Sequence, residues 1–298
     1  AVFLYNFGAA LLRAVGDSVT PLLFLILSSL MNVALDILFV VYLDFGVSGA
    51  AEATVISQYL SGGGIFIYCL FRREFHISGK DRVWNREIFW DMSKLSLLTS
   101  LQQSIMNFGI LLVQGLVNSF GTTVMAAFAA GVKIDTIAYS PLQDFGNAFS
   151  TYAAQNWGAG NKARIRQGVI TAGKMIFLFS ILASCLVSLL APTLMGFFVP
   201  ETAEEVIAVG AHYLRIEGSC YLGIGILFML YGFYRAIKRA GMSVILTILS
   251  LGTRVVLAYF LSSFPEIGVT GIWLSIPIGW ALADMYGIIK GYKLMGWR

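Results

Sequence analysis

Apolar residues fill this chain in long uninterrupted runs that short polar segments separate. A helix needs roughly 20 apolar residues to cross a bilayer, and these runs lack the period of two that a membrane strand requires. Pro141 predicts a kink or an end near Ser140 in the fourth of the predicted spans, and Pro277 predicts a bend in the last. The pattern predicts eight membrane-spanning helices, at residues 21–43, 47–71, 95–119, 122–149, 166–191, 207–233, 242–263 and 269–292.

Composition agrees with a chain that lies largely within a membrane. It is 58% hydrophobic and 12% charged, with a mean hydropathy of +0.79, whereas a soluble domain is roughly 25% charged. We therefore expect an all-α integral membrane protein, a polytopic helical bundle in the plasma or inner membrane, with no nucleic-acid partner. The three cysteines and two histidines show no metal-ligand spacing. A membrane-embedded enzyme would need such a cluster, so we expect neither an enzyme nor a metal or redox cofactor.

Lysine and arginine are concentrated on alternate loops. Sixteen of the twenty, counting Lys290 at the edge of the last span, lie in one set of segments, and the intervening loops contain none. Because the cytoplasmic loops of membrane proteins are enriched in these residues, the basic set predicts the cytoplasmic side. The basic segments are 13–20, 72–94, 157–165 with Arg166 at its edge, 234–241 and the carboxyl terminus.

Part of the chain occurs twice. Residues 12–72 align without a gap with residues 234–294, at a constant offset of 222 positions and with 13 identities. Both copies contain an Arg-Ala pair, at Arg13 and Arg235, followed by a Gly-Val-x-Gly turn. Six predicted crossings separate the copies, so both should have the same orientation. The repeat therefore predicts two lobes related by a pseudo-two-fold axis along the membrane normal, as in parallel-repeat transporters.

The repeat also predicts the domain organisation. The counterpart of residue 95 would lie at position −127, since 95 minus 222 is −127, so we expect an amino-terminally truncated chain. The complete protein would have two six-helix lobes, of which helices 4–12 are present here. Residues 1–72 would form the second half of the amino-terminal lobe. Residues 73–94 would form a cytoplasmic linker, and residues 95–298 the carboxy-terminal lobe.

Four segments resemble signatures of the multidrug and toxic compound extrusion (MATE) family, DinF-like bacterial branch. The resemblance implies a MATE or MOP-type fold in a multi-pass monomer. It also implies alternating-access export of small organic, often cationic, compounds by a protein whose other partners are membrane lipids. Entry of Na⁺ or H⁺ would drive the export, and no other cofactor is implied. The segments are Leu12 to Pro21, Asn32-Val33-Ala34-Leu35-Asp36, Gly46 to Thr54, and Gln155-Asn156-Trp157-Gly158-Ala159-Gly160-Asn161-Lys162.

Asp36 is the strongest candidate for a functional charge inside the membrane, where ionisable side chains are costly and usually functional. Asn32 lies one turn away on the same helix face, and Thr54 lies at a similar depth on the next span. Their oxygens suit Na⁺, or a proton held by Asp36. An interhelical hydrogen-bonding role for Asp36 is the alternative. The resemblance implies that these residues, with Ala50 near a backbone contact, form part of an amino-lobe cation site that an Asp on helix one completes.

The second copy of the repeat lacks this site. At the 222-residue offset the three side chains are replaced by Arg254, Ala258 and Ile276. NorM-like members of the family carry acids on helices seven and ten, where this sequence has apolar residues near Met106 and Ile224. Cation coupling of that type is therefore not expected.

Five charged residues in the predicted carboxy-terminal lobe should lie at a similar depth in the membrane. Since a lone charge there is costly, we expect them to form a paired network. It would serve either as a structural salt-bridge network or as a lining that contacts substrate and gates access. The five residues are Lys133, Asp135, Arg215, Glu217 and Arg254.

Polar, sulfur-containing and aromatic side chains are further candidates for contact with substrate. Gln103, Met106, Asn107 and Tyr139 suit a cleft that accepts apolar cations, although such residues also serve lipid and helix packing. A lipid-linked oligosaccharide flippase of the same superfamily is the alternative function, because the charged cluster contains three basic residues.

Overall fold

The computed structural model consists of helices that fall into two units. Contacts define the units as Ala1–Arg86 and Glu87–Arg298, and each is described by itself. The boundary lies within the predicted linker 73–94, of which Lys80 and Arg82 lie outside the described residues. All regular secondary structure in the described residues is helical. Those residues are 1–76, 83–200 and 202–297.

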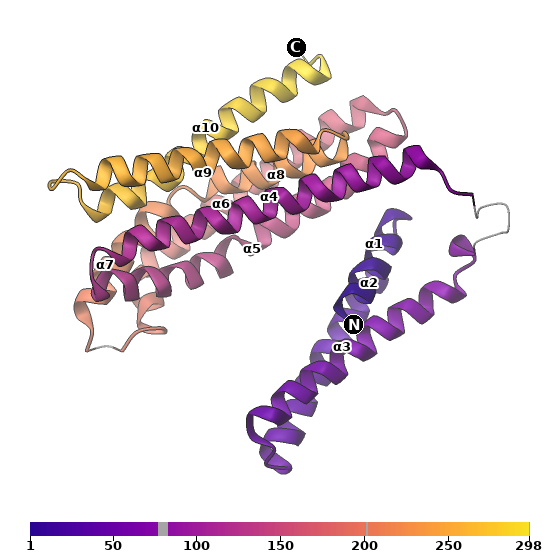
Figure 1. The fold of residues 1–298 in the computed structure, drawn as a ribbon, viewed down its shortest axis with the longest axis horizontal. Helices are drawn as coiled ribbons and strands as arrows, with labels where there is room; N and C mark the ends of the chain where they lie inside the picture. Colours follow the sequence, from indigo (N-terminus) through magenta and orange to yellow (C-terminus); the bar gives the residue numbers. More distant parts are fainter. Residues whose placement is uncertain (77–82, 201, 298) are drawn as a thin grey trace. The chain divides into compact units, whose positions relative to one another are not determined.

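In the first unit, a long helix packs against two others. Helix α2 continues directly into a π-helical segment, η1, and α3 contacts both α1 and α2 (Figure 1). The helices are α1 (Val2–Ala14), α2 (Val19–Asp36), η1 (Ile37–Tyr42), α3 (Gly46–Phe71) and the short 3-10 turn η2 (Arg73–Phe75). Apolar and small side chains line the contacts between α1 and α3, which bury Ala9, Leu12, Ile65 and Cys69.

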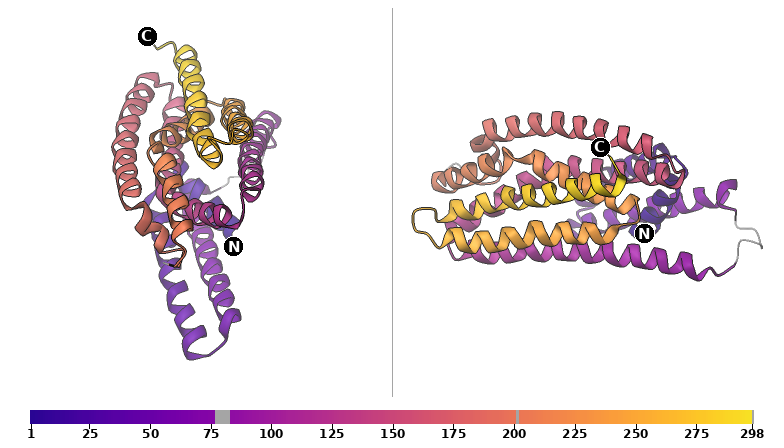
Figure 2. Two further views of the ribbon diagram at one scale, coloured as in Figure 1. Left: turned by 90° about the vertical axis from the view of Figure 1, so that its left-hand side faces the viewer. Right: turned by 90° about the horizontal axis from the view of Figure 1, so that it is seen from above.

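The second unit is a helical bundle, and its long helices run beside one another (Figure 2). Helix α5 packs against α6, α7 and α8, and α9 packs along α10. Aromatic side chains such as Tyr213 and Trp273 are fully buried at the centre. The helices are α4 (Arg86–Asn118), α5 (Thr122–Gly158), α6 (Lys162–Gly196), α7 (Glu204–Gly218), α8 (Tyr221–Ala236), α9 (Ala240–Ser262) and α10 (Val269–Met295).

The helices confirm a multi-pass membrane protein, but not every predicted span. Among the described residues, six helices are long and apolar enough to cross a membrane, or seven if α7 and α8 count as one bent span. Helix α5 is long enough, but it is not among these helices. Its sequence contains Lys133, Asp135 and Asp144, which lower its hydropathy.

The structure bears on two predictions about breaks in the helices. The expected single span 207–233 is two helices that meet at a bend of 52° near Ser219. By contrast, α5 passes through Pro141 and does not end near Ser140. The hydroxyl groups of Thr136 and Ser140 each donate to the backbone carbonyl one turn earlier, which adds hydrogen bonds in the turn where proline lacks an N–H.

One glycine of the repeated turn has positive φ in both copies. Gly46 has a φ of +58°, and Gly268, its counterpart 222 positions later, has a φ of +50°. Positive φ is unfavourable for a side chain with a Cβ atom, so both turns require glycine. The sequence repeat is therefore also a structural repeat at this point.

Candidate functional site

Helices α2 and α3 bring together three of the four residues predicted to bind a cation. The Asn32 side-chain amide donates to the Thr54 hydroxyl across 3.4 Å, and that hydroxyl donates to the Ala50 carbonyl across 3.0 Å. A short turn joins the two antiparallel helices, so residues equally far from the turn lie beside each other. This explains why positions 22 residues apart meet.

Asp36, the fourth predicted residue, is the last residue of α2 and is half-buried. Its Oδ1 atom is buried and has no hydrogen-bond partner among the described residues. The π-helical segment η1 begins directly after it, and such segments are frequent at functional sites. A carboxylate oxygen without a partner in the membrane is suited to accept a cation or a proton. The chemistry of the four residues fits Na⁺, whose ligands would be these hard oxygens, or H⁺.

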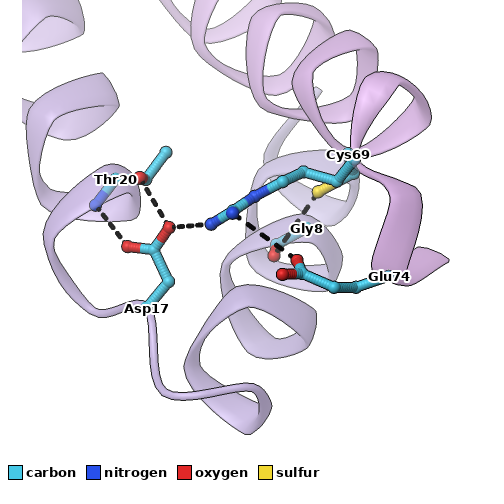
Figure 3. Close-up of polar contacts among 6 residues, drawn as sticks. Gly8, Asp17, Thr20, Cys69 and Glu74 are labelled. Atoms are coloured by element: carbon cyan, nitrogen blue, oxygen red, sulfur yellow. Dashed lines mark hydrogen bonds and ion pairs between the residues drawn. The ribbon is translucent and has the colours of Figure 1, made fainter.

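The same unit holds a second polar group at the opposite ends of its helices (Figure 3). Asp17 accepts hydrogen bonds from the backbone N–H and the hydroxyl of Thr20, at 3.0 and 2.8 Å. Arg72, just after α3, lies 2.6 Å from the Asp17 carboxylate and 3.5 Å from that of Glu74. The Thr20 hydrogen bonds, followed by Arg72, hold the pKa of Asp17 below its usual value. This group ties the start of α2 to the end of α3.

The five predicted charges of the second unit do not form one network. Lys133 and Arg215 are exposed, whereas Asp135, Glu217 and Arg254 are buried. Residues two positions apart on a helix point in nearly opposite directions, so 133 and 135 cannot face the same side, nor can 215 and 217. The sequence-based prediction grouped these residues by their depth in the membrane and did not consider which face of the helix each side chain occupies. Of the five charged residues, only Asp135, Glu217 and Arg254 lie inside the bundle.

Most of the residues predicted to contact substrate line two cavities in the second unit. One, of about 100 Å³, is lined by Met106, Tyr139, Glu217 and Arg254. The other, of about 180 Å³, is lined by Gln103 and again by Met106. Met106 therefore belongs to both cavities, and helix α4 forms one wall of each.

Asn107 is not among the residues of these two cavities, and its place in a substrate cleft stays a prediction. This side chain is exposed. It lies about 100° around α4 from Met106, because each residue of an α-helix turns by one part in 3.6. The face of α4 toward the bundle instead contains Thr99, Gln102, Gln103, Met106 and Ile110.

Sequence reasoning missed several residues of these cavities. Gln143 lines both, and Asn147 and Arg235 line the larger one. The Arg235 guanidinium donates to the Asn147 side-chain oxygen across 2.8 Å. A signal was present, because Tyr139, Gln143 and Asn147 recur every four residues on one face of α5. Arg235 was noticed only as a marker of the repeat.

Long apolar helices define a multi-pass membrane protein, and buried polar side chains around internal cavities are typical of transporters. A family model described as MatE matches residues 98–260, which is more than half of the chain. The chain belongs to this family of efflux transporters.

Known proteins resemble the chain along most of its length. It is 30% identical over 305 residues to the Bacillus subtilis (strain 168) protein named "Probable multidrug resistance protein YpnP", covering 100% of this chain and 66% of that protein. It is 24% identical over 277 residues to "Probable multidrug resistance protein NorM" of Thermotoga maritima, covering 90% of this chain and 58% of that protein. The chain thus spans two thirds or less of the length of these curated relatives.

Solved structures show the same fold. One is described as the outward-facing conformation of a multidrug resistance MATE family transporter of the MOP superfamily. It has a TM-score of 0.90 at 25% identity, covering 98% of this chain and 66% of that one. A MOP superfamily transporter from Pyrococcus furiosus has a TM-score of 0.90 at 26% identity, with the same coverage. The MATE-type helical fold predicted from the sequence is therefore confirmed.

Proposed function

We propose that this protein exports small organic, often cationic, compounds across the plasma or inner membrane and that entry of Na⁺ or H⁺ at Asp36 drives the export. The observation that carries the proposal is the contact of Asn32, Thr54 and Ala50 beside a carboxylate oxygen of Asp36 that lacks a partner. Membership of the MatE family and the multidrug-resistance names of its relatives support efflux.

Coupling requires that cation and substrate have different affinities for two states of the transporter. A cation at Asp36 would neutralise its carboxylate and bridge α2 to α3 through Asn32 and Thr54. The substrate would bind near Met106 and Tyr139, whose polarizable thioether and aromatic ring suit an apolar cation. As the transporter alternates between its two states, the cation enters and the substrate leaves.

The test replaces Asp36 with asparagine, which keeps the shape of the side chain and removes its charge. Asp36→Asn should abolish dye efflux driven by an imposed Na⁺ or pH gradient in membrane vesicles. Asp44→Asn is the matched control, because Asp44 is exposed in the turn before α3 and has a φ of 54°, which asparagine tolerates. Gradient-driven efflux at the wild-type rate in Asp36→Asn would refute the proposal. Comparing the Na⁺ gradient with the pH gradient in the wild type identifies the ion.

The flippase alternative receives less support. Two of the three basic residues that suggested it, Lys133 and Arg215, are exposed, and of these three only Arg254 lines a described cavity. Arg235 lines the neighbouring one. Binding assays with a cationic dye and with an isoprenoid pyrophosphate lipid separate the two functions. Specific binding of the lipid without binding of the dye would favour the flippase.

A further inference from the structure

A third pocket of the second unit, of about 550 Å³, lies between the start of α4 and the turn that joins α8 to α9. Its volume is within the range of ligand pockets in proteins, roughly 300–1,000 Å³. The backbone of α4 approaches the other helices of this unit less closely than they approach one another, which leaves room for the pocket. The walls include parts of segments 72–94 and 234–241, whose basic residues predict the cytoplasmic side. The proposed export mechanism makes no use of this pocket.

The apolar part of the lining faces outward. Several apolar side chains that α4 and α9 contribute to it are exposed, and on the helices of a membrane protein such side chains suit contact with lipid chains. These side chains are Ile88, Met92, Leu95 and Ile245.

The charged part of the lining is mostly positive. Lys94, Lys238 and Arg239 line the pocket together with a single acid, Asp91. Lys238 Nζ lies 2.9 Å from a carboxylate oxygen of Asp91. Lys94 and Arg239 have no ion pair among the described residues. Positive charges beside exposed apolar side chains complement an anionic phospholipid, whose phosphate lies at the membrane surface and whose acyl chains lie within the membrane.

The backbone at Lys238 gives independent support. Lys238 has a φ of +59°, which is uncommon for a residue with a Cβ atom, and its counterpart in the first copy of the repeat is Gly16, with a φ of +93°. The helices before them end with backbone hydrogen bonds at equivalent positions. An exposed ion pair such as that of Lys238 with Asp91 contributes little, so it does not offset this conformation. Because strained backbone is retained mainly at functional sites, the lysine at this position indicates a function for its side chain.

We propose that this pocket binds one anionic phospholipid. The phosphodiester lies beside Lys94, Lys238 and Arg239, and the acyl chains run along the exposed apolar side chains of α4 and α9. The bound lipid would therefore connect the start of α4 to the turn between α8 and α9. The site is separate from Asp36 and from the two inner cavities.

Native mass spectrometry of the purified protein tests this proposal by titration with phosphatidylglycerol and with phosphatidylcholine of the same acyl chains. The wild type should bind one phosphatidylglycerol more tightly than it binds phosphatidylcholine. The double variant Lys238→Gln/Arg239→Gln should weaken phosphatidylglycerol binding about tenfold, because two charges that attract the phosphate are lost. The matched control, Lys290→Gln/Lys293→Gln, removes two exposed charges of α10 outside the pocket and should bind like the wild type. Equal affinity for the two lipids, or equal losses in the two variants, would overturn the proposal.

A milder variant keeps the test decisive if the double variant does not fold. Lys238→Gly relieves the positive φ, so its thermal unfolding temperature should not fall, whereas its phosphatidylglycerol binding should weaken. Binding at the wild-type affinity in this variant would contradict the assigned site. Displacement of the lipid by an equal concentration of glycerol 3-phosphate would show a site for soluble anions and would also overturn the proposal. Asp36→Asn should bind phosphatidylglycerol like the wild type, so this result is independent of the proposed transport mechanism.

Discussion

The two copies of the repeat share their backbone contacts and differ in their chemistry. A Cβ atom added to Gly49 would lie 3.0 Å from the Cβ of Phe39, and one added to Gly271 would lie 2.6 Å from the Cβ of Leu261. Each pair is related by the offset of 222 residues, so the same close approach of two helices occurs in both copies. The side chains at the polar positions differ between the copies; for example, Arg254 occupies the position that corresponds to Asn32. Helix packing thus constrains this repeat more strongly than the chemistry of its polar positions does.

The comparison has a further lesson about charge. Where the first copy has Asn32, an amide that can bind a cation, the second copy has the fixed positive charge of Arg254. That charge is buried near Glu217 and lines a cavity. The guanidinium of Arg254 is thus a permanent positive charge at this position of the second copy. This agrees with the absence of a counterpart of Asp36 there.

The largest expected effect comes from removing this fixed charge. Arg254→Met keeps much of the side-chain volume but leaves the two buried acids without a compensating charge. We expect it to lower the free energy of unfolding by about 3 kcal/mol, as for other broken buried charge groups. Asn32→Ala, its counterpart in the first copy, should cost about 1 kcal/mol, because it removes one hydrogen bond. Denaturant unfolding in detergent measures both, and equal losses would contradict the comparison.

An intermediate effect is expected at the shared helix contact. Gly271→Ala should destabilise the protein by about 2 kcal/mol, because the new methyl group would also lie 2.9 Å from the backbone carbonyl carbon of Leu261. Gly49→Ala should cost about 1 kcal/mol, since its two nearest neighbours are side-chain Cβ atoms at 2.9 and 3.0 Å. The same unfolding measurement ranks the two variants. A larger loss for Gly49→Ala than for Gly271→Ala would contradict this ranking.

The smallest effect concerns Asp17, which corresponds to Arg239 in the second copy. Because its pKa is lowered in the folded protein, its stabilising contribution is complete above the usual pKa of 3.8 and is lost as the pH falls through the folded value. Hydrogen exchange in α1 to α3 should therefore accelerate at acidic pH. Asp17→Asn should remove this part of the pH dependence. Identical pH profiles for the variant and the wild type would rule out the contribution.

Much of the fold could be predicted because its signal is long and repetitive. Apolar runs located the helices, and the ungapped offset matched turns such as Gly46 and Gly268. The break near Ser219 was missed because the apolar pattern continues on both sides of it. The π-helical winding after Asp36 was missed because no residue there excludes an ordinary α-helix.

The candidate sites were predicted less evenly. Asn32, Thr54 and Ala50 could be placed together, because a short turn fixes the register of two helices. Lys133 and Arg215 do not join the buried charges as predicted for a single network, because depth alone does not specify which way a side chain points. Cavities such as the one beside Met106 depend on how several helices pack, and a single sequence contains little information about that packing.

The turn between η1 and α3 has a mechanical consequence. Only three residues separate Tyr42 from Gly46, and the hydroxyl of Ser28 also donates to the carbonyl of Ser57 across 2.8 Å. These two restraints leave the hairpin little freedom to open. A cation held by Asn32 and Thr54 would therefore keep the same contacts as long as this hairpin moves as one rigid piece.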